Sequence, residues 1–517
     1  MSVKHRNARQ AWHRCRDPGI RAERKLRRCM RLSNSMASTW FTTRAAPSRP
    51  GRTRIRSIHD KPHRETVSIG TFPGRERDGP GEDELDRVSI ADGHYRHGLR
   101  RVLGRRINEP NRAATPLELL FDLTFVAAFG VAGNQLAHGI AIGQWQSATV
   151  AFLFALFSVV WAWINVTWFA SGFDNDDWLH RLLTLVQMTG VIVLGIGLPP
   201  LFASIESGDA LDNRLMVAGY VVMRVALILQ WLRAVRADSR FRPAAVTYAV
   251  FVGGAQVGWA LVAALPLHAF AGLAVALVLF GIEALGPFIA ERRGARDEDG
   301  STPWHPHHLA ERFALLTIVA LGETVFGTLA SATEISAGQG WTVETIVVVG
   351  AGIALSFCLW WTYFLVPHAL ALEVRREKTL PWGYAHVFLY AAIAAVGAGL
   401  HVVGYAHDPQ YRVSATTAVA SVAIPVVVFV MVRDFLQAWL VSARPPSTVL
   451  QIGSALLPVA AIGLATAGVP VWVCLLVVLA SPLSIIVWFE LGGWRLLDTQ
   501  LAQVVGRTGR PGPSLPD

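Results

Sequence analysis

Two carboxylates, Glu118 and Asp122, open the first long apolar stretch of this chain. Because they stand four residues apart, they share one face of a helix, in the first turns where the helix macrodipole favours negative charge. An acidic cap at a membrane surface explains Glu118 well. Asp122 lies one turn deeper, where a charge loses more of its hydration, and a carboxylate inside a membrane is a candidate functional group.

Three more charged residues interrupt long apolar runs: Glu323, Glu283 and Arg224. At 1.5 Å per residue, Glu323 lies roughly 18 Å beyond Glu311 on the seventh apolar run, which predicts a position near the middle of a bilayer. Pairing Arg224 with Glu323 or with Glu283 would offset part of the cost of burying these charges. Such a pair need not stabilise the protein more than apolar residues would.

Charged side chains inside apolar runs could line a polar path for a small solute or an ion. The alternative is that they only hold neighbouring helices together, which is also the expectation for Asn165, Thr167 and Gln187. The candidate polar path comprises Glu118, Asp122, Arg224, Glu283, Glu311 and Glu323.

His307 and His308 stand four and three residues before Glu311, a spacing that could place metal ligands on one helix face. No HExxH motif or second ligand set accompanies them, and Pro306 disrupts the local helix. A histidine-rich helix start at the membrane surface is the commoner explanation. We therefore expect His307 and His308 to form a surface cluster, and we expect no metal or other cofactor.

The sequence lacks the short motifs of the common enzyme classes. It has no GxSxG, no P-loop and no GxGxxG after a strand, so we predict that the protein is not an enzyme and has no catalytic residues. Most of its 18 tryptophans stand toward the ends of apolar runs, where we expect them to form a belt at the membrane interface. Examples are Trp161, Trp163, Trp168, Trp360 and Trp361.

Long apolar helices must position these side chains. Of the 517 residues, 52% are hydrophobic and 16% are charged, whereas about 25% of the residues of soluble domains are charged. From Glu118 on, apolar windows of roughly 18–25 residues recur, long enough to cross a hydrocarbon core about 30 Å thick. We predict an all-α, polytopic integral membrane protein with about twelve transmembrane helices, a helical domain at 113–490 and a cytoplasmic tail at 491–517. The expected spans are 118–138, 147–169, 179–204, 212–235, 243–264, 268–290, 309–331, 343–369, 384–405, 414–441, 449–467 and 470–489.

Positive charge is concentrated at the N-terminus. Residues 1–113 carry 27 of the 47 Lys and Arg but only 12 of the 37 Asp and Glu. Residues 1–112 have no long apolar run and no regular periodicity, so we expect a disordered basic arm and no signal peptide. Met30 and Met36 offer later starts, and we interpret the arm as a dispensable extension whose start is assigned too early. It could touch anionic lipid headgroups, whereas we do not expect it to bind nucleic acid.

The connections between the expected spans alternate in charge. Those that follow even-numbered spans carry arginine clusters such as Arg292, Arg293 and Arg296, whereas those that follow odd-numbered spans hold only Arg214 and Arg412. Positive residues are retained on the cytoplasmic side. We therefore predict a protein of the cytoplasmic membrane with both termini inside.

The first and seventh spans are alike. Laying Glu118 on Glu311 makes Thr124 coincide with Thr317 and several apolar residues coincide after it. Because six spans separate the two aligned helices, the alignment predicts two six-helix halves of like topology, related by an axis along the membrane normal.

Motifs spread over at least six spans point to a known family. They include Thr115–Val126 in the first span, Trp163–Phe169 with Phe173–Asp177 in the second, and His308–Phe313 with Leu321–Glu323 in the seventh. Further agreement lies at Arg181, Arg224, Gln230–Arg233, Gly286–Pro287 and Trp361–Phe364. From about residue 112 to 490 the chain resembles the bacterial low temperature requirement protein A family. The resemblance implies a membrane protein linked to growth in the cold, and the long basic arm departs from the family pattern.

We expect a transporter or channel that moves a small solute or ion across the membrane. The alternative is a non-transporting membrane protein that senses or organises lipid in cold adaptation. Polar residues converging from several helices on one cavity favour transport, whereas residues that pair singly between neighbouring helices favour the alternative. An enzyme acting on lipid-embedded substrates would need a cluster at one membrane face, for which only His307, His308 and Glu311 qualify. The expected partner is the lipid bilayer, and the sequence does not set an oligomeric state.

Overall fold

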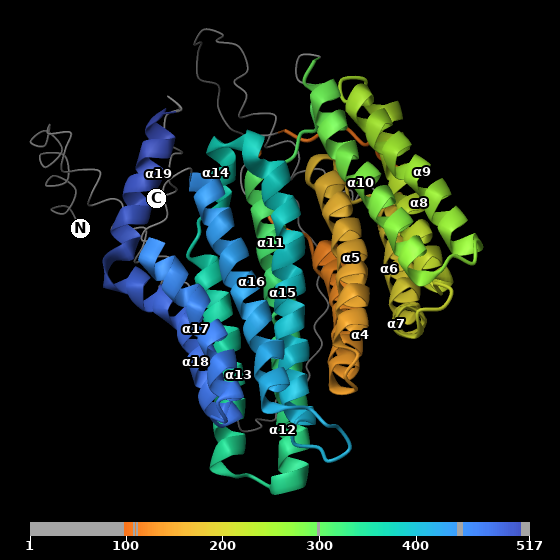
Figure 1. The fold of residues 1–517 in the computed structure, drawn as a ribbon. Helices are drawn as coiled ribbons and strands as arrows, with labels where there is room; N and C mark the ends of the chain where they lie inside the picture. Colours follow the sequence, from red (N-terminus) through yellow and green to blue (C-terminus); the bar gives the residue numbers. More distant parts are fainter. Residues whose placement is uncertain (1–97, 107–108, 110–111, 297–299, 442–447, 508–517) are drawn as a thin grey trace, which may run out of the picture. The chain divides into compact units, whose positions relative to one another are not determined.

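The described part of the chain is built of helices. The computed structural model describes residues 98–106, 109, 112–296, 300–441 and 448–507. Within these residues lie twelve helical segments that are long and apolar enough to cross a membrane (Figure 1). Each overlaps one of the predicted spans, so the predicted all-α, polytopic membrane fold is confirmed.

Short connections join the helices. The elements are α4 (Pro116–Ala141), α5 (Trp145–Phe173), α6 (Trp178–Ile196), α7 (Leu198–Ser207), α8 (Arg214–Ala237), α9 (Arg242–Ala264), α10 (Ala269–Gly294), α11 (Pro306–Ala320), α12 (Gly322–Gln339), α13 (Val343–Phe364), α14 (His368–Val374), η1 (Arg376–Lys378), α15 (Thr379–Tyr405), α16 (Ala415–Val441), α17 (Thr448–Thr466), α18 (Val471–Trp488), η2 (Phe489–Gly493) and α19 (Trp494–Arg507). Successive spans run in opposite directions. We call the end at which α4 starts the basic end, since Arg105, Arg181 and Arg233 lie there, and we call the other the opposite end.

Some spans are broken within the membrane region. The third span divides into α6 and α7 at Gly197, just before Pro199 and Pro200, which cannot donate to the helical hydrogen-bond ladder. The seventh span divides into α11 and α12 at Leu321, although no proline stands there. Gly322 follows this second break, and glycine is the residue that tolerates a local change of helical direction most easily.

The two groups of six spans have the same order of neighbours. In the first group α6 contacts α8, α8 contacts α9 and α9 contacts α10, while α4 contacts both α5 and α6. In the second group α15 contacts α16, α16 contacts α17 and α17 contacts α18, while α12 contacts both α13 and α15. This is the order that two halves of like topology require.

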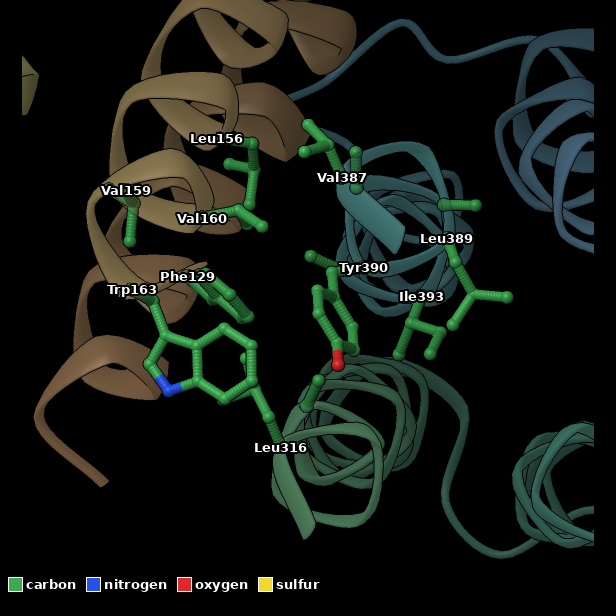
Figure 2. Packing of buried hydrophobic residues seen from close by; sticks show 14 of the residues in the cluster. Phe129, Leu156, Val159, Val160, Trp163, Leu316, Val387, Leu389, Tyr390 and Ile393 are labelled. Atoms are coloured by element: carbon green, nitrogen blue, oxygen red, sulfur yellow. The ribbon is translucent and has the colours of Figure 1, made fainter. Parts of the chain in front are cut away.

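Side chains from α4 and α5 meet side chains from α11 and α15 where the two groups touch (Figure 2). Phe129, Trp163, Leu316 and Tyr390 lie there, one from each helix. The Trp163 ring centroid is 4.8 Å from that of Phe313 and 6.0 Å from that of Tyr390, both edge to face. Such aromatic packing holds the first and second spans against the seventh and ninth.

Glycines let α12 and α15 approach each other closely. A Cβ atom on Gly327 would lie 2.0 Å from the carbonyl oxygen of Gly397, and one on Gly397 would lie 2.4 Å from the carbonyl oxygen of Glu323. A side chain at either glycine would therefore push the helices apart. Close backbone contact through small residues is a usual way of packing helices in lipid, and here it fixes Glu323 against α15.

The segment 98–106, part of the predicted basic arm, contacts the basic end of the helices. The backbone N–H of Gly104 donates a hydrogen bond of 3.3 Å to Asp238, and Val102 is buried. The segment 98–106 therefore packs as part of the helical domain, which starts before the predicted boundary at residue 112. Residues 1–97, 107–108 and 110–111 of the predicted arm lie outside the described residues.

The predicted C-terminal tail begins with further helix. The last span bends at η2, where Gly492 has a φ of 137°, a conformation open mainly to glycine. Helix α19 then continues to Arg507. The final ten positions of the predicted tail, 508–517, lie outside the described residues.

Candidate functional site

The charged candidates lie at three separate places in the helical domain, not along one path. Each place is defined by its own contacts within the spans. The three are the Arg312 site, which holds Glu118 and Asp122; the Glu283 site, which holds Arg224; and Glu323 at the break of the seventh span. The sixth candidate, Glu311, belongs to none of them.

Arg312 of α11 joins the two carboxylates that open α4. Its Nη1 lies 2.7 Å from Oε1 of Glu118, and its Nη2 lies 2.6 Å from Oδ1 of Asp122. The same Asp122 oxygen accepts a hydrogen bond of 2.6 Å from Nε1 of Trp163. All four side chains are buried. One cation that bridges two carboxylates needs α4 and α11 in register, so the Arg312 site fastens the first span to the seventh.

Glu118 has two further contacts. Oγ1 of Thr115 accepts from the backbone N–H of Glu118 at 3.2 Å, and Oε2 of Glu118 accepts from the backbone N–H of Thr115 at 2.8 Å, the reciprocal pair of a capping box. Nε2 of His308 lies 3.2 Å from Oε1 of Glu118. Glu118 therefore acts as the helix cap that its position predicts, and it also belongs to the Arg312 site.

Arg312 is absent from the predicted path, because it stands beside Glu311 at the charged start of its span. The signal that could have identified it is spacing, since Arg312 follows His308 by four residues and shares its helix face. A buried arginine needs an acidic partner. That partner, Asp122, is 190 residues away in the sequence, so sequence spacing could not have supplied the pairing.

Glu283 lies midway along α10 and is surrounded by donors from three other helices. The donors are Arg224 Nη2 at 2.8 Å, the Tyr220 hydroxyl at 2.7 Å and Trp161 Nε1 at 2.9 Å, all to Oε2, and Trp259 Nε1 at 2.9 Å and Gln256 Nε2 at 3.2 Å, both to Oε1. The guanidinium of Arg224 also lies over the Tyr220 ring, 4.6 Å from its centroid. Of the two partners that the sequence offered Arg224, the structure selects Glu283.

The tryptophans of α5 differ from the prediction. Trp161 and Trp163 are 1% and 0% exposed, and they donate to Glu283 and Asp122. Trp168 is also buried and donates a hydrogen bond of 3.0 Å to Thr302. The prediction of an interfacial belt is therefore wrong for these three. An indole combines a large apolar surface with a single donor, which suits a carboxylate enclosed by apolar side chains.

Glu323 is the second residue of α12, directly after the break. Its side chain is half-buried, and it makes no hydrogen bond or ion pair with the residues that the structure describes. A Cβ atom on Gly130 would lie 3.2 Å from Oε1 and 3.3 Å from Oε2, so the carboxylate faces the backbone of α4. The alignment of Glu118 with Glu311 also pairs Gly130 with Glu323, so equivalent positions of the two halves meet here.

The surroundings of Glu323 offer hydroxyls and backbone but no cation within the described helices. The next residue, Thr324, has its Oγ1 2.5 Å from Oγ of Ser356 on α13. The start of α12 favours a negative charge through its dipole, which offsets part of the cost of the carboxylate. A lone charge at the centre of a span still costs about 2.5–3.5 kcal/mol on the insertion scale.

The predicted surface cluster at the start of α11 is divided. His307 is exposed, with Nε2 3.3 Å from Oε2 of Glu373, whereas His308 is buried in the Arg312 site instead of at the surface. Glu311 accepts a hydrogen bond of 3.2 Å from the backbone N–H of Ala114. The described residues contain no group of three or more His, Cys, Asp or Glu side chains placed to hold a metal ion.

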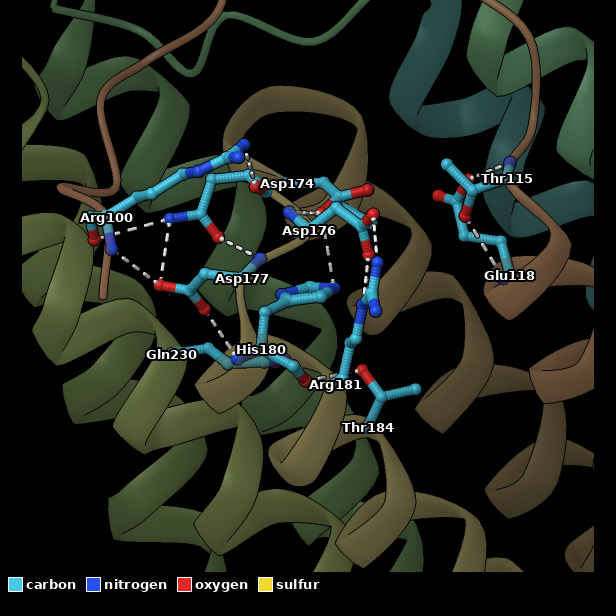
Figure 3. Close-up of polar contacts among 12 residues, drawn as sticks. Arg100, Thr115, Glu118, Asp174, Asp176, Asp177, His180, Arg181, Thr184 and Gln230 are labelled. Atoms are coloured by element: carbon cyan, nitrogen blue, oxygen red, sulfur yellow. Dashed lines mark hydrogen bonds and ion pairs between the residues drawn. The ribbon is translucent and has the colours of Figure 1, made fainter. Parts of the chain in front are cut away.

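The acidic connection between α5 and α6 lies among arginines at the basic end (Figure 3). Asp177 caps α6 by accepting from the backbone N–H of His180 at 2.7 Å, and it binds the Arg233 guanidinium and the backbone N–H of Arg100. Burial alone would raise the pKa of Asp177, but these hydrogen bonds outweigh it and lower the pKa below its ordinary value. The connection is thus fastened to the fourth span and to the segment before the first.

A match to a known protein family covers all three places. Residues 113–481 match the family described as bacterial low temperature requirement A protein, LtrA. An uncharacterized protein of Rhizobium meliloti (strain 1021) is 29% identical over 325 residues, a stretch that covers 60% of this chain and 71% of the relative. The matched region of this chain begins at residue 113, just before the first span starts at Pro116.

Proposed function

This chain belongs to the bacterial low temperature requirement A family, and from that premise we propose that it transports a small solute or an ion across the bacterial cytoplasmic membrane. The observation that carries the proposal is Glu323, a half-buried carboxylate with no cation beside it among the described residues, at the break of a membrane span. Intramembrane carboxylates are costly and mark ion and substrate paths, often at broken helices. Since the family is named for a low temperature requirement, we propose that this transport supports growth in the cold.

The other two places hold the helices that surround the path. Both oxygens of Glu283 are occupied by donors, which leaves none for a passing ion. Oδ2 of Asp122 has no hydrogen-bond partner among the described residues, but the atom is buried behind Arg312 and Trp163. We therefore place the path at Glu323 and give the Arg312 and Glu283 sites a positioning role.

The second candidate function is a non-transporting protein that senses or organises lipid. The observation in its favour is that the Arg312 and Glu283 sites each join neighbouring helices through buried ion pairs. Under this alternative Glu323 would be one more contact between helices. Neither of the two candidate functions is enzymatic.

The proposed orientation places both termini in the cytoplasm. The basic end, which holds Arg105, Arg181 and Arg233, would then face inward, as the retention of positive residues requires. Reporter fusions after Arg106 and after Arg507 should both report a cytoplasmic position. A fusion that reports the outside at either point would contradict the orientation. The basic arm would then lie beside the anionic inner leaflet.

Flux into liposomes tests the proposal. Purified full-length protein should carry protons, K⁺ or Na⁺ across the bilayer faster than empty liposomes leak them. The Glu323→Gln variant should insert but lose the flux, because the amide keeps the size and removes the charge. Glu373→Gln is the matched control, since Glu373 lies at the surface beside His307. Flux that is absent in the wild type, or unchanged in Glu323→Gln, would favour the non-transporting alternative.

A further inference from the structure

A seam between three helices leads from Glu323 to the opposite end. Helices α4 and α15 run from the basic end to the opposite end, and α12 runs from the break of the seventh span to the opposite end. Each of the three contacts the other two. Glu323 lies where they meet, with its carboxylate at α4 and its backbone at α15. The side chains that line the seam beyond Glu323 therefore decide which ions or molecules can reach its carboxylate.

On α4 the seam is lined by Gly130, Asn134 and His138, which share one face because they are four residues apart. Gly130 faces the carboxylate, and both Asn134 and His138 are exposed. An exposed asparagine one turn from the middle of a span is costly against acyl chains but not against water or a polar partner. This face of α4 therefore suits a hydrated seam.

On α15 the corresponding stripe is Gly397, His401 and Tyr405. The ring centroids of His401 and Tyr405 are 4.5 Å apart, and Tyr405 lies 4.5 Å from Tyr411 in the loop beyond. Tyr411 in turn meets His138 of α4 edge to face at 6.3 Å. The rings form one continuous ladder from the turn after Glu323 to the opposite end, where it closes onto α4.

The helical positions place His401 inside the seam. Helix α12 covers the side of α15 that holds Gly397 and Gly404, where added Cβ atoms would lie 2.4 Å and 2.9 Å from α12 backbone atoms. Helix α4 covers the side of α15 that holds Ala398. A Cβ atom added to Gly133 of α4 would lie 4.0 Å from the Cβ of Ala398. At about 100° per residue, His401 points between these two sides.

We propose that Glu323 binds a proton and exchanges it with the opposite end along this seam, with His401 as the next titratable group. The inference rests on the proposed function and names the proton as the ion that occupies its site. An arriving proton forms an O–H bond with a carboxylate oxygen and neutralises the charge. Its release to water in the seam restores the carboxylate. Neutralisation removes the lone charge that the described helices leave uncompensated.

Three other titratable groups near the seam are engaged elsewhere or turned away. On the basic side, Asp122 is bound to Arg312. On α13, Cys358 follows Ser356 by two residues and so points about 200° away from the hydroxyl that meets α12. At the opposite end Glu344 lies 3.5 Å from His407. Two titratable groups stand farther along the seam: His138 follows Gly130 by eight residues, and Glu334, whose Cγ would lie 3.4 Å from a Cβ on Gly404, follows Glu323 by eleven. His401 follows Gly397 by only four residues, so it is the titratable group next to Glu323.

Labelling by dicyclohexylcarbodiimide tests the proposal without any transport. The reagent adds to a protonated carboxyl in an apolar environment, and the adduct is located by mass spectrometry of the full-length protein. Glu323 should be labelled, and its labelling rate should fall roughly tenfold per pH unit once the carboxyl titrates. Glu283, whose two oxygens are enclosed by Arg224 and four neutral donors, should be labelled at least tenfold more slowly than Glu323. Added Na⁺ or K⁺ should leave the rate unchanged at constant pH.

Variants of Glu323 and His401 test whether the labelling depends on the carboxyl and on the seam. Glu323→Gln should abolish the adduct and Glu323→Asp should keep it, which separates loss of the carboxyl from loss of the fold. His401→Phe keeps a ring against Tyr405 but cannot carry a proton, so its labelling should change with pH differently from the wild type. His407→Gln, at the same end but outside the ladder, is the matched control and should follow the wild type.

Three results would overturn the inference. They are labelling of Glu323 no faster than that of Glu283, protection of Glu323 by Na⁺ or K⁺ at constant pH, and a pH dependence unchanged by His401→Phe. The second result would make Glu323 a metal cation site. The labelling stands apart from the flux assay, because a protein that labels as expected but carries no flux would contradict the transport function and leave the protonation of Glu323 intact.

Discussion

Glu283 and Glu323 are the same residue type at similar depth in two membrane spans, yet their surroundings differ completely. Glu283 accepts hydrogen bonds from five side chains, one of them the guanidinium of Arg224. Glu323 faces the backbone of α4 at Gly130 and has no such partner among the described residues. Neither depth nor residue type distinguishes the two carboxylates.

The difference shows that the hydrogen-bond donors around a buried carboxylate decide its role. A carboxylate surrounded by donors and a carboxylate without them behave in opposite ways. A carboxylate held by a cation and neutral donors stays charged and fixed, and removing any partner leaves an uncompensated group. A carboxylate without a partner can bind and release a positive ion at little structural cost. We expect Glu283 to respond to mutation as a structural residue and Glu323 as a functional one.

The largest loss of stability should follow Arg312→Met. This change leaves two buried carboxylates, Glu118 and Asp122, one turn apart and without their shared cation. Breaking one buried pair costs about 3–5 kcal/mol, and here two partners are stranded. We expect little folded protein by size-exclusion chromatography. A monodisperse variant with a wild-type thermal midpoint would show that the site does not hold α4 to α11.

Arg224→Met should be the next most damaging change, because it strands only Glu283. We expect a loss of about 3–5 kcal/mol, whereas the double variant Arg224→Met, Glu283→Met should recover most of it, since no charge is then left buried. Thermal unfolding in detergent, followed by tryptophan fluorescence, measures both. A double variant less stable than the single one would argue that Glu283 acts through its neutral donors.

Asp177→Asn should have a smaller effect, which depends on pH. The Asn oxygen can still cap α6, but the change removes the charge that pairs with Arg233, for a loss of about 1 kcal/mol at neutral pH. Because the folded pKa of Asp177 is lowered, its contribution is complete above the unfolded pKa of about 3.9 and is lost as the pH falls through the folded value. Wild type and variant should therefore converge in strong acid, and a gap that persists there would contradict the assignment.

The smallest effect should follow deletion of residues 1–95, which removes the arm but keeps the segment 98–106. We expect normal insertion and an unchanged thermal midpoint. Deletion of residues 1–106 is the matched comparison, and it should destabilise the protein because it exposes the surface that Val102 covers. If the shorter deletion alone prevents insertion, the arm contributes to folding and is not dispensable.

The spans themselves could be predicted from the sequence, because an apolar run of about 20 residues has few alternatives to a membrane helix. The break at Leu321 could not, since no proline stands there to signal it. The spacing of Glu118 and Asp122 identified a shared helix face. It could not identify Arg312 as the residue facing them, because spacing within one helix does not determine which distant helix packs against it.

The tryptophans also show that the sequence does not determine contacts between distant helices. Position near the end of an apolar run is typical of interfacial tryptophan, but Trp161 and Trp163 instead supply donors to buried carboxylates. Their role depends on carboxylates carried by other helices. The sequence predicts that Arg224 pairs with Glu323 or with Glu283, because opposite charges inside spans are few. It does not decide between the two, and the structure pairs Arg224 with Glu283.

The contrast between the two carboxylates is tested most directly with the variants Glu323→Gln and Glu283→Gln. Their thermal stability is measured beside the wild type, in the same detergent and at neutral pH, and their flux is measured in liposomes. We predict that Glu323→Gln is at least as stable as the wild type and loses flux, because it removes a charge that has no partner among the described residues. We predict that Glu283→Gln loses about 3–5 kcal/mol by stranding Arg224. A Glu323→Gln protein that is as unstable as Glu283→Gln, or one that keeps full flux, would contradict the functional assignment of Glu323.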